Sequence, residues 1–111
     1  MDTRAKIISV EEARDIAGEK EVHWITGHFD PLLAEHAAIL HANAEAGRLM
    51  IVEVTNPAQP LLPLRARAEL VAALAQVDYV VMSDQRADAP DEDITRRFIH
   101  HVHQRVNGAQ R

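Results

Sequence analysis

Three short apolar runs, separated by helical patterns, constrain the fold of this 111-residue chain more than any other feature. They lie at residues 22–26, 49–54 and 77–82, and each contains β-branched or aromatic side chains. Apolar residues along nearly a whole strand are typical of parallel strands, because helices cover both faces of a parallel sheet. The alternation of these runs with helices predicts an α/β fold with an open parallel sheet of three to four strands and helices on both faces.

Capping residues mark the ends of the expected helices. Ser9 and Glu12 form a capping-box pattern that begins a helix after the short apolar stretch 6–8, and Gly18 is expected to end that helix. Further helices are expected at residues 32–46 (ended by Gly47), 64–75 and 90–106.

Apolar spacing predicts the inner faces of two of these helices. The face of the 32–46 helix contains Leu33, Ala37, Leu40 and Ala44. The face of the 64–75 helix contains Ala66, Leu70, Ala73 and Leu74. Residues 56–63, with three prolines, and residues 83–88 are expected to be loops.

Composition excludes several classes of function. A chain of this length can bury a core of its own, so residues 1–111 are expected to form a single domain. The absence of cysteine excludes disulfides, thiolate catalysis and Cys-ligated metals. A net charge of −5, from 12 Lys+Arg against 17 Asp+Glu, argues against nucleic acid as a partner. Neither a membrane span nor a signal peptide is recognisable, so we expect a cytoplasmic protein without membrane association.

The segment from Thr26 to His36 has the pattern of an anion-binding turn. It follows an expected strand, contains Gly27 and opens an expected helix. Free backbone N–H groups and the helix dipole attract anions at such a helix N-terminus. Within this segment, Asp30 is expected to cap the following turn and helix, with Pro31 at the first helical position.

Four pieces of the chain, taken in order, resemble the cytidylyltransferase-like nucleotidyltransferases, and most closely the adenylyltransferase domain of ADP-heptose synthases. They are residues 6–13, Thr26-Gly27-His28-Phe29-Asp30, residues 67–74 and residues 77–81. The resemblance implies a Rossmann-like, nucleotidyltransferase-like domain, here trimmed at its C-terminus. Such domains join a nucleoside triphosphate to a phosphorylated small molecule and release pyrophosphate.

The chain departs from that family at its most characteristic motif, His-x-Gly-His. The motif aligns with Leu33-Ala34-Glu35-His36, so only its last histidine remains. Leu33 removes a donor that would stabilise charge on the attacked phosphate. Glu35 replaces a glycine that lets the backbone approach the phosphates, and adds a negative charge beside them. A degenerate motif of this kind is typical of a pseudoenzyme.

The turn and the resemblance together give a set of candidate site residues. His36, with His28 as a replacement donor, is the candidate catalytic pair. Nucleotide or phosphate binding is expected from Thr26, Gly27, His28, Phe29, Asp30, His36, Arg65 and Arg67. Structural alternatives stay open for several of them: His36 as a capping or packing residue, Phe29 as a core residue, and the two arginines as part of a solvated helix face.

Two groups of histidines, one of them with a glutamate, resemble metal ligands, but a structural role is favoured for both. His28, Glu35 and His36 lie within nine positions, yet no residue that would orient them can be named. His100 and His103 share a helix face near His101, where surface positions are expected. No metal site is therefore predicted.

Two functions remain open at this point. The favoured one is a degenerate nucleotidyltransferase-like domain without transferase activity, acting as a weak nucleotide-binding or protein-interaction and regulatory module. The alternative is an active adenylyl- or cytidylyltransferase that joins a nucleoside triphosphate to a phosphorylated sugar or alcohol. Mg²⁺ with ATP or CTP is expected only if the domain is active. An open sheet edge or apolar helix face would also favour a homodimer.

Overall fold

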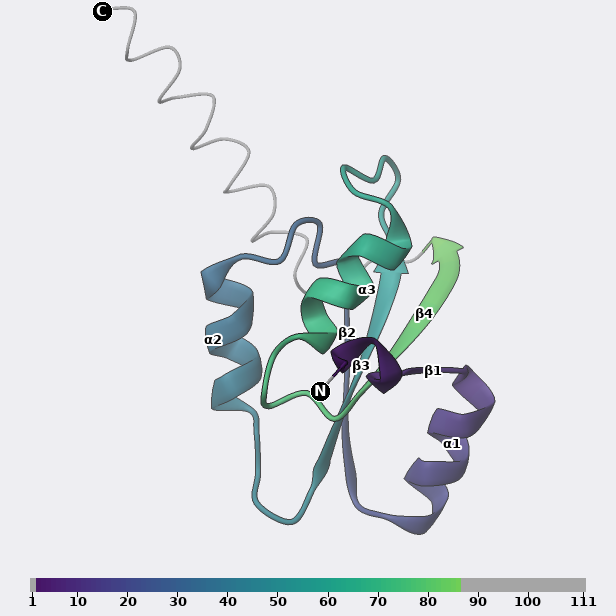
Figure 1. The fold of residues 1–111 in the computed structure, drawn as a ribbon, viewed down its shortest axis with the longest axis vertical. Coiled ribbons are helices and arrows are strands. Elements are labelled where there is room, and N and C mark those ends of the chain that lie inside the picture. The colour runs from purple at the N-terminus through teal and green to yellow at the C-terminus, as the bar shows by residue number, and fades with distance from the viewer. Residues whose placement is uncertain (1, 87–111) are drawn as a thin grey trace, which may run out of the picture.

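A parallel four-stranded sheet with helices on both faces forms the centre of the protein (Figure 1). The computed structural model describes residues 2–86. The elements follow in the order η1, a 3-10 helix (Thr3–Lys6), β1 (Ile7–Ile8), α1 (Val10–Glu19), β2 (Val22–Gly27), α2 (Ala34–Ala42), β3 (Leu49–Asn56), α3 (Leu64–Ala72) and β4 (Tyr79–Arg86). The expected helix at 90–106, and with it His100, His101 and His103, lies outside the described residues.

The sheet has the strand order β1-β4-β3-β2, and every neighbouring pair is parallel. Helices α2 and α3 pack on one face, where Leu40 and Val71 share a cluster of buried residues with Val52. Helix α1 packs on the other face, where its Ala13 contacts the cluster containing Ile51. This arrangement confirms the predicted Rossmann-like α/β fold.

Strand β1 is the one element of the sheet that the sequence analysis did not assign. It has two residues, Ile7 and Ile8, which pair with Val80 and Val81 of β4. Two residues are too few to show a strand periodicity, and the pairing joins positions far apart in the sequence. Local patterns therefore could not reveal this strand.

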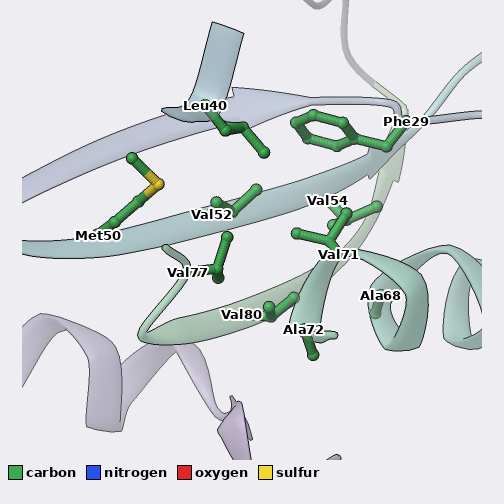
Figure 2. Packing of buried hydrophobic residues seen from close by; sticks show 10 residues of the cluster. All are labelled: Phe29, Leu40, Met50, Val52, Val54, Ala68, Val71, Ala72, Val77 and Val80. Carbon is green, nitrogen blue, oxygen red and sulfur yellow. The ribbon is translucent and has the colours of Figure 1, made fainter. Parts of the chain in front are cut away.

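The larger hydrophobic core lies between the sheet and helices α2 and α3 (Figure 2). Valines of β3 and β4, among them Val52, Val54 and Val80, are fully buried there. Complete burial of a valine or leucine side chain contributes about 1.5–3 kcal/mol relative to an exposed position. The core members are Phe29, Leu40, Met50, Val52, Val54, Ala68, Val71, Ala72, Val77 and Val80.

Three predicted helix ends differ from the structure, one of them in α3, which ends at Ala72 and not at residue 75. Ser9 begins α1 as predicted, with its side chain accepting a hydrogen bond from the Glu12 amide at 3.1 Å, but the helix continues through Gly18 to Glu19. Helix α2 is shorter than the predicted 32–46 and ends at Ala42. Gly47 instead lies in the turn before β3 with a φ of +82°, a left-handed conformation that favours glycine.

The predicted inner face of α3 was largely wrong: of its four residues, Leu74 packs against the core, just beyond the end of the helix. The buried residues of this helix are Arg67, Ala68, Val71 and Ala72, whereas Leu70 is 45% exposed. The buried face of α3 differs from the predicted one because it includes an arginine. A prediction from apolar spacing alone assigns arginine to the solvent-exposed face. Arg67 therefore shares the inner face of α3 with Ala68, Val71 and Ala72.

The predicted loop at 83–88 was also wrong, because β4 continues to Arg86. Its extension pairs with the polar end of β3, where Asn56 stands opposite Arg86 after an irregularity in the register. The side-chain amide of Asn56 also donates to the Asp84 carbonyl at 3.2 Å. Pairing with a neighbouring strand therefore overrides the polar character of residues 83–86.

Within residues 2–86, the structure contains no helix long and apolar enough to cross a membrane.

Candidate functional site

The candidate site lies at the carboxyl ends of β2 and β3, where ligands bind in open parallel sheets. Gly27 ends β2, and the following segment 28–33 leads to α2. The proline-containing loop 57–63 leads from β3 to α3. Two hydrogen bonds join these segments: the Asp30 carboxylate accepts from the amides of Leu61 at 2.6 Å and Leu62 at 2.8 Å.

Arg67, on the inner face of α3, forms hydrogen bonds with both of these segments. Its side chain is fully buried, and within residues 2–86 its guanidinium donates to four oxygens of the protein. Nε donates to the Leu62 carbonyl at 3.0 Å, and Nη1 donates to the carbonyls of His28 at 3.0 Å and Thr55 at 2.7 Å. Nη2 donates to the Asn56 side-chain oxygen. One cation therefore binds the segment after β2, the end of β3 and the loop before α3.

Asp30 completes what we call the Arg67 network, defined by Arg67, Asp30, Asn56 and the backbone of His28, Thr55, Leu61 and Leu62. The carboxylate of Asp30 is 2% exposed and lies 3.9 Å from Arg67 Nε. A buried charge is costly unless hydrogen bonds and an opposite charge surround it. The two buried charges compensate each other, and each is bonded to backbone groups.

The predicted capping role of Asp30 was wrong. Helix α2 begins at Ala34, with Leu33 as the residue before its first turn, so Asp30 and Pro31 lie outside the helix. The carboxylate of Asp30 caps the loop at 61–62 instead of a helix. Sequence spacing favoured the nearest helix, whereas the true partners lie about thirty residues away in the chain.

The two candidate arginines occupy different environments. Arg65 is exposed on α3 and pairs with Glu69 at 3.4 Å, as expected for a solvated helix face. Arg67 is buried in the Arg67 network, so a solvated helix face was wrong for this residue. The structure thus separates two residues that the sequence analysis placed in one phosphate-binding group.

The aromatic residues of the turn are buried between β2 and α2. His28, Phe29 and His36 are each at most 3% exposed. Phe29 has a φ of +48°, an uncommon conformation for a residue with a side chain. Its ring belongs to the core and contacts the His36 ring, with centroids 5.4 Å apart.

His36 lies in the first turn of α2 and holds the start of that helix. Its Nδ1 accepts a hydrogen bond from the Leu33 amide at 2.9 Å. The neutral imidazole that makes this bond carries its proton on Nε2. The capping alternative for His36 is therefore present in the structure, and its role toward a ligand stays a prediction.

The described residues do not support a metal site formed by His28, Glu35 and His36. Residues 2–86 contain no group of three or more His, Asp or Glu side chains placed to hold a metal ion. Glu35 is exposed in the first turn of α2, whereas His28 and His36 are buried.

The sequence analysis missed three polar residues of β3 that support the site. Thr55 donates from its hydroxyl to the Gly27 carbonyl at 3.4 Å, and Asn56 accepts from Arg67. Glu53 accepts from the Thr26 hydroxyl at 3.4 Å, which places Thr26 and Gly27 in hydrogen bonds with the neighbouring strand. The available signal was the series Glu53, Thr55 and Asn56 in an otherwise apolar strand.

The chain is similar in sequence to bifunctional proteins named HldE. It is 34% identical over 103 residues to the bifunctional protein HldE of Campylobacter curvus, covering 82% of this chain and 22% of the relative. It is 29% identical over 92 residues to the bifunctional protein HldE of Helicobacter pylori, covering 75% of this chain and 20% of the relative. The chain thus spans about a fifth of the length of these relatives. No family model matches the chain. HldE is an ADP-heptose synthase, so the predicted resemblance to that group is confirmed as a distant similarity.

The Arg67 network yields a stability prediction. Arg67→Met should lower the free energy of unfolding by about 3–5 kcal/mol, because it leaves the Asp30 carboxylate and several carbonyls buried without their cation. Arg65→Met, two residues earlier on the same helix, should change it by less than about 0.5 kcal/mol. Urea unfolding followed by circular dichroism measures both. Similar losses for the two variants would contradict the assignment.

Proposed function

We propose that this chain is a degenerate nucleotidyltransferase-like domain that binds a nucleotide weakly and does not transfer it. The observation that carries the proposal is the start of α2, where Leu33 and Glu35 stand in place of the residues that the related motif would supply. The relatives named HldE support a nucleotide as the ligand class, and the open parallel sheet supports the carboxyl edge as its place.

The loss of transfer follows from the chemistry of the turn. Phosphoryl and nucleotidyl transfer depend on positioned donors that stabilise charge on the attacked phosphate. Leu33 offers only its backbone amide, which already bonds to His36. Glu35 brings a carboxylate to the helix N-terminus, and two like charges 4 Å apart repel by about 4 kcal/mol at an effective dielectric constant of 20.

The position of Arg67 supports the same proposal. A phosphate site gains much of its affinity from cations that reach the ligand. The Arg67 guanidinium has no exposed surface and bonds to oxygens of the protein, so it fixes the shape of the site from within. Arg65 is exposed and remains the candidate cation for a ligand phosphate.

An active transferase is the second candidate. His36 and His28 both lie at the turn, and a donor from His28 would replace the one lost at Leu33. Such an enzyme would use Mg²⁺ with ATP or CTP and a phosphorylated sugar or alcohol. The charge at Glu35 and the absence of a donor at Leu33 favour the degenerate domain over this alternative.

Restoring the motif residues separates the two functions. In Leu33→His/Glu35→Gly, removal of the repulsion and addition of a donor should raise the affinity for ATP or CTP with Mg²⁺ at least about tenfold in isothermal titration. The wild-type chain should release no pyrophosphate from either nucleotide with phosphorylated sugars as acceptors. Pyrophosphate release by the wild type would contradict the proposal, as would a double variant that folds but gains no affinity.

We also propose that the chain forms a homodimer along β2 and α2. Within residues 2–86, β2 is an edge strand, and its sequence carries neither the lysine nor the proline that commonly protects an edge. A two-fold related copy would pair with β2 in the antiparallel sense and satisfy the outer backbone groups of both chains. Ile39 of α2, 44% exposed, would lie in such an interface.

Two lysine substitutions test the dimer. Ile39→Lys should shift the dimer to monomer in sedimentation velocity, because it places a charge in the interface. Leu70→Lys on α3 changes a leucine of similar exposure, 45%, and should leave the dimer intact. A wild-type chain that sediments only as monomer at high concentration would contradict the homodimer.

A further inference from the structure

Glu53 is a charged residue in the middle of a central strand. Its strand neighbours Val52 and Val54 are fully buried, and β4 and β2 flank the strand on its two sides. Glutamate is rare in such a position, because removing a carboxylate from water is costly without compensating hydrogen bonds. A half-buried carboxylate in such a strand is a candidate for ligand recognition when one of its oxygens can still accept a hydrogen bond.

The hydrogen bonds of Glu53 use one of its two carboxylate oxygens. The Trp24 indole donates to Oε1 at 3.1 Å, and the Thr26 hydroxyl donates to the same oxygen at 3.4 Å. Within residues 2–86, Oε2 accepts no hydrogen bond. Two donors from β2 therefore orient the carboxylate, while its second oxygen keeps its capacity to accept.

A hydrogen bond joins the carboxylate to Thr26, just before the candidate nucleotide turn. Thr26, which stands directly opposite Glu53 in the register of β2 and β3, immediately precedes Gly27. Thr55, two residues beyond Glu53 on the same side of β3, donates to the Gly27 carbonyl. Glu53 is three residues from the end of β3 at Asn56, a distance of roughly 10 Å along a strand.

We propose that Glu53 Oε2 accepts hydrogen bonds from the ribose hydroxyls of a nucleotide whose phosphates lie at the turn. This inference rests on the proposed function and names the part of the ligand that one side chain recognises. In dinucleotide-binding Rossmann folds, an acidic residue about 20 residues beyond the Gly-rich phosphate turn hydrogen-bonds a ribose hydroxyl, which is the analogy that we draw for Glu53. Glu53 has this place in the order β2, turn, α2, β3, and a carboxylate can accept from two adjacent hydroxyls.

The chain contains its own reporter for this contact. Trp24 is the sole tryptophan, and its indole N–H bonds to the carboxylate in question. A ribose bound at Oε2 would alter the surroundings of that indole. Tryptophan fluorescence can therefore follow the titration of the whole chain with ATP or with 2′,3′-dideoxy-ATP, which lacks both hydroxyls.

The test compares the two nucleotides on the wild type and on Glu53→Gln. Hydrogen bonds to a charged acceptor predict that the wild type binds ATP at least about tenfold more tightly than dideoxy-ATP. Glu53→Gln keeps an oxygen for Trp24 and Thr26, so it should fold and bind both nucleotides with the lower affinity. Glu69→Gln, a glutamate of α3 paired with Arg65, serves as the matched control and should retain the preference.

Each outcome has a defined meaning. Equal affinities of the wild type for ATP and dideoxy-ATP would overturn the role of Glu53 and leave the proposed nucleotide binding in place; this comparison requires no variant. A preference that survives Glu53→Gln would also overturn it. Failure of both nucleotides to bind the wild type at millimolar concentration, measured by isothermal titration as well as fluorescence, would overturn the proposed function itself.

Discussion

The buried guanidinium of Arg67 is the interaction on which the carboxyl edge of the sheet depends. It bonds to the backbone of His28 and Thr55 and to the side chain of Asn56, so the ends of β2 and β3 are held to α3. Asp30 compensates its charge and binds the loop amides at 61–62. Because a buried charge must keep its partners, this network allows little variation in the relative positions of the turn, the loop and the helix.

In the degenerate domain that we propose, the shape of the candidate site is retained although Leu33 and Glu35 replace two residues of the related motif. The network fixes the turn between β2 and α2. Phe29 of this turn belongs to the core, and its ring contacts that of His36. Leu33 and Glu35, in contrast, lie at the start of α2 and are not among the residues that define that network. This separation explains how a chain can keep the fold of a nucleotidyltransferase-like domain after its motif has changed, since fold alone does not determine function.

Local patterns predicted most of the fold but not the contacts of the site. The three apolar runs became β2, β3 and β4, and the Ser9 capping box began α1, because these signals reside within a few residues. The inner face of α3 and the role of Asp30 were predicted wrongly, since the burial of Arg67 and the bonds of Asp30 to the amides of Leu61 and Leu62 join segments that are far apart in the sequence. The full length of β4 depends on pairing with β3, which no single segment encodes.

We propose that the turn from Gly27 to His36 binds a nucleotide weakly and does not process it. The most direct measurement is a titration of the ¹⁵N-labelled wild-type chain with ATP or CTP and Mg²⁺, followed by the NMR shifts of the backbone amides. We predict saturable shifts that cluster at residues 27–36, with the nucleotide recovered unchanged. The absence of shifts at millimolar nucleotide would contradict the account and indicate that the fold serves a protein partner instead.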